Sequence, residues 1–516
     1  MNKNICNLLF LFSVISLIFN NVPKFLQINF LGGSIGHQLV FYPIFIGLIY
    51  TIYCQIKYKN IFVYFSLFKK FLCLYFGILC LSLFIGLYNY PYYDCILAGS
   101  VNQIEKLPIA LNFIHNLGIN INKDTLFFCW MLIRPLKGLI LDTLYTFCGS
   151  YMFFCWYYKN WETGFNILIK GVICSLSIVI IYSCIDVLYL SGNEIGRKIL
   201  EVVTPYIHEV KSDHNWWPPL LWKNQLRSVF SEPSHVGNYI AITLPILWFL
   251  VLKNRKYVTL SLLYYILFTC IIFLTQSRTA YAMYLGITFL FVLGISLVSW
   301  QQYYKKIILL LLTSCFSFFL SVLFINQVMV LENNESIQLN KNKITATQII
   351  SNNLGSLSDE HQRSNGARYA MLKSHVKMGV SHPILGLGVS LNDSYSKDYL
   401  TLDEKKDQEI NMWLQDQKKD GLLKYPLGAM NEYVERFSST GFLGLLVFLF
   451  PFFYGIYELL KIIMISKRLE YVCLLIALIG AMVAGMNGSL TLLYSIWIIL
   501  GLTYAVICSE INNRRT

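Results

Sequence analysis

An arginine, a carboxylate and an imidazole lie within nine residues, at Arg227, Glu232 and His235, directly before the apolar run 240–252. Charged groups at a membrane boundary are costly unless they are paired or used. A guanidinium offers a rigid fork of N–H donors that matches phosphate oxygens, and Glu232 and His235 are both candidates for a general base. The stretch therefore indicates a site for a phosphate-bearing lipid. The alternative is structural: an interfacial arginine beside a helix N-terminus, with Glu232 as a favourable first-turn anion.

Three further arginines are candidates for contacts with the same phosphate groups. Arg278 lies in a predicted tight turn between two apolar runs, where it could instead be a structural tie. Arg363 and Arg368 lie in a long hydrophilic segment, and Arg368 shares one face of a predicted helix with His375. Such a helix could also be a solvated lid that makes no contact with the site.

The polar stretch 431–436 directly precedes another apolar run. Glu432 is the third candidate for a general base, and Glu435 could also be a base or could simply pair with Arg436. No Asp-x-Asp pair, glycine-rich phosphate loop or Walker-type lysine motif occurs. We therefore expect no nucleotide hydrolysis, no metal site and no cofactor. Several arginines suit a lipid diphosphate, which leaves readily once its charge is neutralised.

The composition indicates a membrane protein. The chain has 516 residues, of which 56% are hydrophobic and 13% charged, whereas soluble proteins carry roughly 25% charged residues. Apolar runs long enough to cross a bilayer recur along the whole length, among them the predicted spans 5–20, 136–158 and 257–275. They predict an all-α polytopic integral membrane protein with about 12 transmembrane helices. The net charge of +13 comes from basic clusters in short loops, the pattern of cytoplasmic loops, and does not indicate a nucleic-acid partner.

The apolar runs divide the chain into three parts. We predict residues 1–325 to hold transmembrane helices 1–9 with shorter external loops (89–135 and 191–235), 326–437 to form a large external loop, and 438–516 to hold helices 10–12 and a cytoplasmic tail. The large loop is too long for a simple turn and should be folded, with helices over 366–379 and 403–419. An even number of spans with basic inner loops places both termini in the cytoplasm.

Four motifs occur in an order typical of a known family: Arg227-x-x-Phe-x-Glu-Pro-Ser, Thr275-x-Ser-Arg278, His382-Pro-x-Leu-Gly-x-Gly388, and Asn431-Glu-Tyr followed by Thr440-Gly-x-x-Gly444. With the long loop before span ten, the set resembles the bacterial O-antigen polymerase and O-antigen ligase superfamily. The resemblance implies a metal-independent, inverting glycosyltransferase of the inner membrane. It also implies that Arg227 and Arg368 bind the diphosphate of the substrate, with Arg278 and Arg363 as further contacts.

Ligases of this superfamily usually show a His-Asn pair before span ten, where this chain has Met430-Asn431. The missing histidine favours an O-antigen polymerase (Wzy). Such an enzyme transfers the growing glycan from undecaprenyl diphosphate to the next lipid-linked repeat unit at the periplasmic face, in lipopolysaccharide biosynthesis. Its partners would be the lipid-linked repeat units, the bilayer and a chain-length regulator. Two alternatives stay open: an O-antigen ligase acting on lipid A–core, and a transporter or flippase of lipid-linked oligosaccharides.

Overall fold

The computed structural model describes residues 1–99, 104–209, 225–253, 257–327, 345–353, 355 and 365–515. All regular secondary structure within these residues is helical. In this part of the chain, eight helices are long and apolar enough to cross a membrane: α4 (Phe65–Tyr88), α10 (Trp161–Leu190), α12 (Ser234–Lys253), α14 (Arg278–Val298), α15 (Trp300–Gln327), α20 (Glu432–Ser466), α21 (Leu469–Ala484) and α22 (Tyr494–Arg515). The prediction of an all-α, polytopic membrane protein is thus confirmed.

The number of such helices is smaller than the predicted twelve. Two of the remaining predicted spans, 5–20 and 257–275, correspond to apolar helices that are shorter, α1 (Lys3–Ile15) and α13 (Val258–Leu274). The predicted span 136–158 is not one α-helix, because a turn of π-helix at Leu144–Cys148 separates two α-helices. Further α-helices before residue 354 are α2 (Asn29–Gly32), α3 (Phe41–Tyr58), α5 (Tyr93–Ala98), α7 (Leu107–Asn116), α8 (Lys123–Thr143), α9 (Gly149–Tyr157), α11 (Glu194–Ile207) and α16 (Ala346–Asn353).

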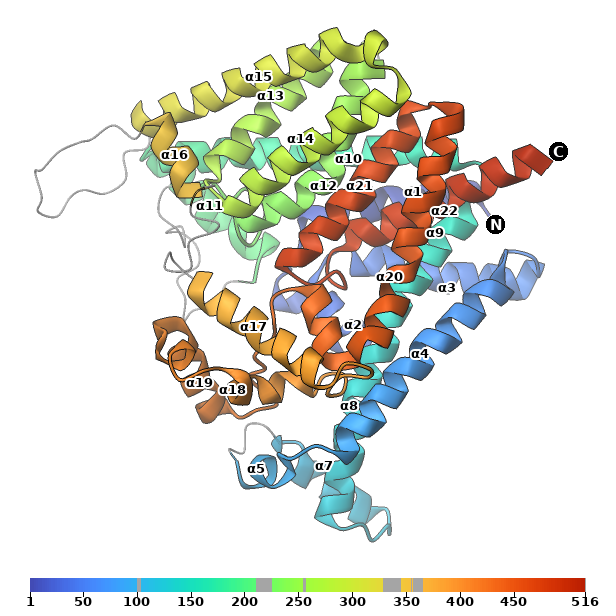
Figure 1. Ribbon diagram of the computed structural model, residues 1–516, viewed down its shortest axis with the longest axis vertical. Helices are drawn as coiled ribbons and strands as arrows, with labels where there is room; N and C mark the ends of the chain where they lie inside the picture. Colours follow the sequence, from blue (N-terminus) through green and yellow to red (C-terminus); the bar gives the residue numbers. More distant parts are fainter. Residues whose placement is uncertain are drawn as a thin grey trace, which may run out of the picture.

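Helix α12 is the central element of the bundle and packs against α14 and α21 (Figure 1). Apart from Asn238 and Thr243, its residues from Val236 to Leu252 are apolar on every side, and most of them are buried. A helix that is hydrophobic all round is stable only when its neighbours cover it. The rigid position of α12 fixes the two residues at its N-terminal end that could do chemistry, Glu232 and His235.

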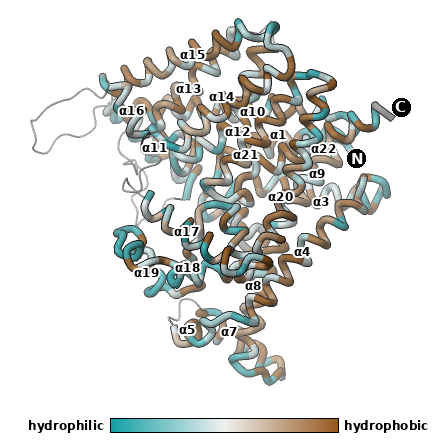
Figure 2. Tube along the Cα trace, in the orientation of Figure 1, coloured by the Kyte–Doolittle hydropathy of each residue, from teal (hydrophilic) through white to brown (hydrophobic). Residues whose placement is uncertain are grey.

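A hydrophilic unit lies at one end of the bundle. It consists of α17 (Asn365–Ser381), α18 (Ser396–Tyr399), α19 (Gln408–Asp420) and their connecting loops, and we call it the cap. Figure 2 shows hydrophilic residues gathered on the cap and apolar residues along the bundle. Helix α17 confirms the helix predicted over 366–379. Helix α19 begins later than predicted because Asp407 caps it, accepting hydrogen bonds from the backbone N–H groups of Glu409 and Ile410.

The cap is tied to the bundle by a crossing of two backbone segments. Four backbone hydrogen bonds join residues 383–388 to residues 438–443, among them one of 2.7 Å from Phe442 N to Pro383 O. The crossing lies at a break in α20, where Gly441 adopts a φ of 63°. Two of the four motifs, the one that begins at His382 and the one that ends at Gly444, therefore form this crossing. Their glycines allow the two backbones to approach each other closely.

We expect Gly386→Ala to destabilise the protein by about 2 kcal/mol or more, because it adds both backbone strain and overpacking. Gly386 has a φ of +68°, and a Cβ atom there would lie 2.4 Å from the carbonyl carbon of Ser439. Gly77→Ala in α4 is the matched control, since a Cβ atom there meets no other atom within 4 Å. The thermal unfolding midpoint of the purified protein should fall for Gly386→Ala only. Equal midpoints for the two variants would show that the crossing does not need glycine.

Candidate functional site

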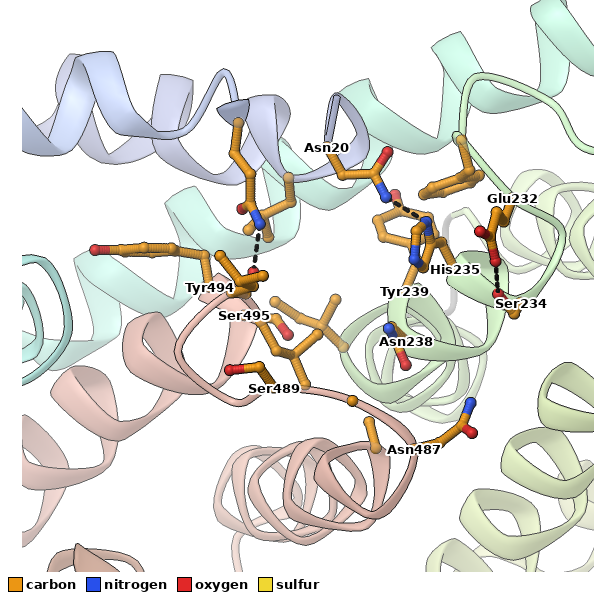
Figure 3. Close-up of a pocket in the computed structure, with 18 of the residues that line it drawn as sticks. Asn20, Glu232, Ser234, His235, Asn238, Tyr239, Asn487, Ser489, Tyr494 and Ser495 are labelled. Carbon is orange, nitrogen blue, oxygen red and sulfur yellow. Dashed lines mark hydrogen bonds between the residues drawn. The ribbon is translucent and has the colours of Figure 1, made fainter. Parts of the chain in front are cut away.

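A polar cavity of about 320 Å³ lies where the N-terminal end of α12 meets the loop between α21 and α22. We call it the site cavity. Figure 3 shows side chains from distant parts of the chain around it. The polar side chains that line it are Asn20, Gln38, Glu232, Ser234, His235, Asn238, Arg368, Asn487, Ser489 and Ser495. The cavity therefore unites three of the residues predicted to act at the site, Glu232, His235 and Arg368.

Hydrogen bonds fix the tautomer of His235. Its Nδ1 lies 2.5 Å from the amide nitrogen of Asn20 (Figure 3). The hydroxyl of Ser231 lies 2.8 Å from the same ring nitrogen. The Asn20 amide is itself oriented, because its oxygen accepts a hydrogen bond from the backbone N–H of Ser231 at 3.2 Å. Nδ1 is thus an acceptor, and a neutral His235 carries its proton on Nε2. In this state the ring offers a hydrogen-bond donor rather than a base.

Glu232 keeps accepting capacity that a general base requires. Its Oε2 accepts one hydrogen bond from the hydroxyl of Ser234 at 3.1 Å (Figure 3). Among the described residues, no second donor contacts this carboxylate. Since Glu232 also lines the site cavity, one carboxylate oxygen is available to take a proton from a bound hydroxyl group.

Both carboxylate oxygens of Glu432, the other acidic candidate for the general base, are engaged by neighbouring residues. Its Oε1 pairs with Arg436 Nε at 2.6 Å, and its Oε2 accepts from Ser489 Oγ at 2.9 Å and from Leu490 N at 3.0 Å. The residue is 5% exposed. These contacts anchor the start of α20 to the loop before α22, and they leave Glu432 less able to accept a further proton than Glu232.

Arg368 is the predicted phosphate-binding arginine that lines the site cavity. It reaches the cavity from α17 of the cap, and its Nη1 donates to Asn487 Oδ1 at 3.1 Å. The amide nitrogen of Asn487 in turn donates to Thr279 Oγ1 at 3.0 Å. The guanidinium is exposed, so it can offer donors to an anion in the cavity.

Arg227 lies behind the wall of the site cavity. It is 3% exposed, and its Nη1 donates to the carbonyl of Ser231 at 3.3 Å. Burial lowers its pKa, while the nearby carboxylate of Asp186 acts in the opposite direction. Burial and the positive charge of Arg227 together lower the pKa of His208 to about 3, so His208 is neutral. Arg227 thus supports the turn that carries Glu232.

Arg278 and Arg363 are the two remaining arginines that were predicted to contact phosphate. Arg278 begins α14, and its Nη1 donates to the side-chain oxygen of Asn365 at 2.6 Å. Because Asn365 begins α17, this contact ties the bundle to the cap, in agreement with the structural alternative. Arg363 lies outside the described residues.

A second polar cavity, of about 430 Å³, lies on the other side of Glu432. Asp393 and Glu435 line it, and the fully buried His375 lies beside them, with Nδ1 at 3.4 Å from Glu435 Oε2. Sequence patterns pointed to His375 only as a neighbour of Arg368 on one helix face. They contained no signal for Asp393, which lies in a short 3-10 helix of the cap, Asn392–Tyr395.

One region of the chain matches a known protein family. Residues 263–449 match the family described as O-antigen ligase. The matched region contains Arg278, Arg368 and Glu432, whereas Glu232 and His235 lie before it. No curated protein matches the chain. The chain is therefore a multi-pass membrane protein that carries, over residues 263–449, a domain of the O-antigen ligase and polymerase family, whose enzymes transfer glycans between lipid-linked substrates.

Proposed function

We propose that the protein is an O-antigen polymerase. It transfers the growing glycan from undecaprenyl diphosphate to the next lipid-linked repeat unit at the periplasmic face of the inner membrane. The observation that carries this proposal is the wall of the site cavity: Met430 lines it beside Arg368, and Glu232 lines it with one oxygen available. Ligases usually have a histidine at the position of Met430, and that histidine is their proposed base. In this chain the carboxylate of Glu232 can take over the role of the base.

The reaction requires a group that accepts a proton, a positive charge beside the leaving group and a hydrogen-bond donor to it. Residues of the site cavity can supply all three. A hydroxyl group of the acceptor sugar attacks the anomeric carbon of the donor, a new C–O bond forms, and the C–O bond to the diphosphate breaks with inversion. Glu232 takes the proton of the hydroxyl group. Arg368 balances the negative charge that grows on the leaving diphosphate, and the Nε2–H of His235 donates to an oxygen of the same group.

The distribution of basic residues supports a periplasmic site. Helix α12 begins at the site cavity and ends at Lys253, which pairs with Glu470. Lys306 lies at the same far end, where it donates to the carbonyl of Val251 at 3.0 Å. Basic residues at the end away from the cap agree with the rule that cytoplasmic loops are positively charged. The cap and the site cavity would then face the periplasm.

An O-antigen ligase is the second candidate, because the matching family carries that description. Deletion of the gene separates the two functions on a gel of surface polysaccharide. A polymerase predicts lipid A–core that carries a single repeat unit, without a ladder, since ligation still proceeds. Uncapped core together with accumulated lipid-linked polymer would overturn the polymerase and show a ligase.

We expect Arg368→Lys to lower the polymerisation rate by about tenfold to a hundredfold, because an ammonium group lacks the planar fork that binds two phosphate oxygens at once. Arg197→Lys is the control, because Arg197 is exposed on α11 and pairs with Glu201 at 3.0 Å, away from the site cavity. Rates are measured on membranes with matched protein levels. A wild-type rate for Arg368→Lys would remove Arg368 from the phosphate site.

A further inference from the structure

A polymerase needs separate sites for two diphosphate groups. In the donor, the diphosphate is bonded to the anomeric carbon that reacts, so it lies beside the general base. In the acceptor, the reacting group is a sugar hydroxyl, and the diphosphate lies at the other end of the repeat unit. Arg368 lines the site cavity together with Glu232 and suits the donor. Under the proposed function, the diphosphate of the acceptor therefore requires an arginine in another place.

The second cavity, of about 430 Å³, adjoins the site cavity. Ser489 and Leu492 line both cavities, so the loop between α21 and α22 forms a shared wall. Glu432 fixes this wall, because its Oε2 accepts hydrogen bonds from Ser489 Oγ at 2.9 Å and from Leu490 N at 3.0 Å. A ligand in the second cavity is thus held next to the place where the donor reacts.

Arg134 of α8 lines the second cavity with most of its donors unused. Its Nη2 donates to the carbonyl of Leu423 at 3.1 Å, and among the described residues this is its one hydrogen bond. No carboxylate of these residues forms an ion pair with it. A guanidinium has five N–H donors, and this side chain is exposed. Arg134 can therefore bind two oxygens of a phosphate group at once.

Asp142 lies on the same face of α8, two turns or about 12 Å further along the helix. It also lines the second cavity, and its carboxylate accepts no hydrogen bond from the described residues. Asp142 lies near enough to Arg436 and Glu432 for electrostatic interaction with both, which places it toward the shared wall. A carboxylate with free oxygens suits the hydroxyl groups of a sugar, each of which can donate a hydrogen bond.

Asp393 and Glu435 also line the cavity, but together they carry less negative charge than two separate carboxylates. Glu435 already accepts hydrogen bonds from Asn392 Nδ2 at 2.5 Å and from Ala429 N at 3.1 Å. Burial and the neighbouring charge of Glu435 raise the pKa of Asp393 well above its usual range, because adjacent carboxyl groups resist ionising together. With a proton on this pair, the cavity wall repels an anionic group less.

Gly138 lies between Arg134 and Asp142 on the same helix face, one turn from each. It lines the second cavity, and a Cβ atom there would meet no other atom within 4 Å. The space between the guanidinium and the carboxylate is therefore open. A larger side chain at this position can fill it without moving the backbone.

We propose that the second cavity binds the acceptor, a second lipid-linked repeat unit, with its diphosphate at Arg134 and its sugar hydroxyls at Asp142. The glycan runs over Gly138 toward the shared wall, beyond which Glu232 lies in the site cavity. The donor occupies the site cavity, so the two diphosphate groups are held in different cavities by different arginines.

The test counts the substrate molecules bound to the purified full-length protein by native mass spectrometry. The probe is the undecaprenyl-diphosphate-linked repeat unit, and Glu232→Gln is the parent variant, in which both molecules bind without reacting. We expect two bound molecules per chain in the parent. Adding Gly138→Leu should reduce the count to one, because the new side chain occupies the cavity. Adding Arg134→Gln should weaken one of the two binding events at least tenfold.

Two controls match these variants. Gly77→Leu adds the same side chain to α4, where a Cβ atom also meets no other atom within 4 Å, and Gly77 lines neither cavity. Lys137→Gln removes a positive charge from α8 outside the cavity, at a side chain that lies over the ring of Phe30 at 4.7 Å. Both should keep two bound molecules, and equal unfolding midpoints would show that all variants are folded.

Two results would overturn the proposal. One is a count of two with unchanged affinity in both Gly138→Leu and Arg134→Gln, which would place the second molecule elsewhere. The other is a single bound molecule in the parent that is lost when Arg368→Gln is added. Should Gly138→Leu fail to fold, Arg134→Gln decides. Polymerisation in vitro together with either result removes only the acceptor site, whereas a single bound molecule without polymerisation removes the polymerase as well.

Discussion

Replacing Glu232 by glutamine should abolish the polysaccharide ladder and lower the polymerisation rate by about 10²–10⁴-fold, the usual contribution of a general base. Glutamine keeps the size of the side chain and can still accept from Ser234, but it cannot take a proton from the attacking hydroxyl. The protein should fold normally, since the Glu232 carboxylate accepts one hydrogen bond from the described residues, from Ser234 at 3.1 Å. The measurement is ladder length and intensity in cells that express wild-type amounts of the variant.

Two matched variants make this result specific. Glu201→Gln removes an exposed carboxylate on α11 and should leave the ladder unchanged. His235→Gln keeps an N–H donor, so we expect a loss of only about tenfold if His235 donates a hydrogen bond to the leaving group. A loss for His235→Gln as large as that for Glu232→Gln would make the imidazole the base. An unchanged ladder with Glu232→Gln would exclude Glu232 from that role.

The second large effect concerns stability. Arg436→Met should destabilise the protein by about 3–5 kcal/mol, because it leaves the buried carboxylate of Glu432 without its counter-ion. Arg436 pairs with Glu432 at 2.6 Å, donates to Tyr75 Oη at 2.9 Å and to Thr491 Oγ1 at 3.3 Å, and lies 4.3 Å from the ring centroid of Phe448. One side chain therefore joins α4, α20 and the loop before α22.

The double variant Glu432→Gln/Arg436→Met separates charge from packing. It removes both charges, so its unfolding midpoint should lie above that of Arg436→Met alone. Arg197→Met, which removes an exposed arginine from α11, should change the midpoint little. A double variant no more stable than Arg436→Met would mean that packing against Phe448, and not the ion pair, accounts for the loss.

The fold class could be predicted from the sequence, whereas the type and length of individual helices could not. Long apolar runs predict a helical membrane bundle because the bilayer demands satisfied backbone groups along about 20 residues. Hydropathy cannot reveal the π-helical turn at Leu144–Cys148, which divides the predicted span 136–158. It also cannot reveal the break at Gly441, because that break depends on a backbone segment that arrives from 383–388.

The candidate site was predictable residue by residue, but not as an assembly. Residue type and position pointed to Glu232, His235 and Arg368, yet nothing in their spacing says that α17 brings Arg368 to the same cavity. Arg227 illustrates the limit more clearly. A charged residue before an apolar run can face a cavity or the protein interior, and here Asp186 in α10, far away in sequence, lies beside it on the interior side.

The contact between His375 and Glu435 lay beyond sequence analysis for a related reason. The two residues come from α17 and α20, and they meet only because the cap folds back onto α20.

The most direct test of the central claim is polymerisation by the purified protein in vitro. Wild-type protein and Glu232→Gln are each incubated with an undecaprenyl-diphosphate-linked repeat unit, in the absence of lipid A–core. If the protein is a polymerase that uses Glu232, the wild type converts the substrate into a series of longer lipid-linked glycans, and the variant does not. Product that forms only after lipid A–core is added, or equal rates for the two proteins, would contradict this account.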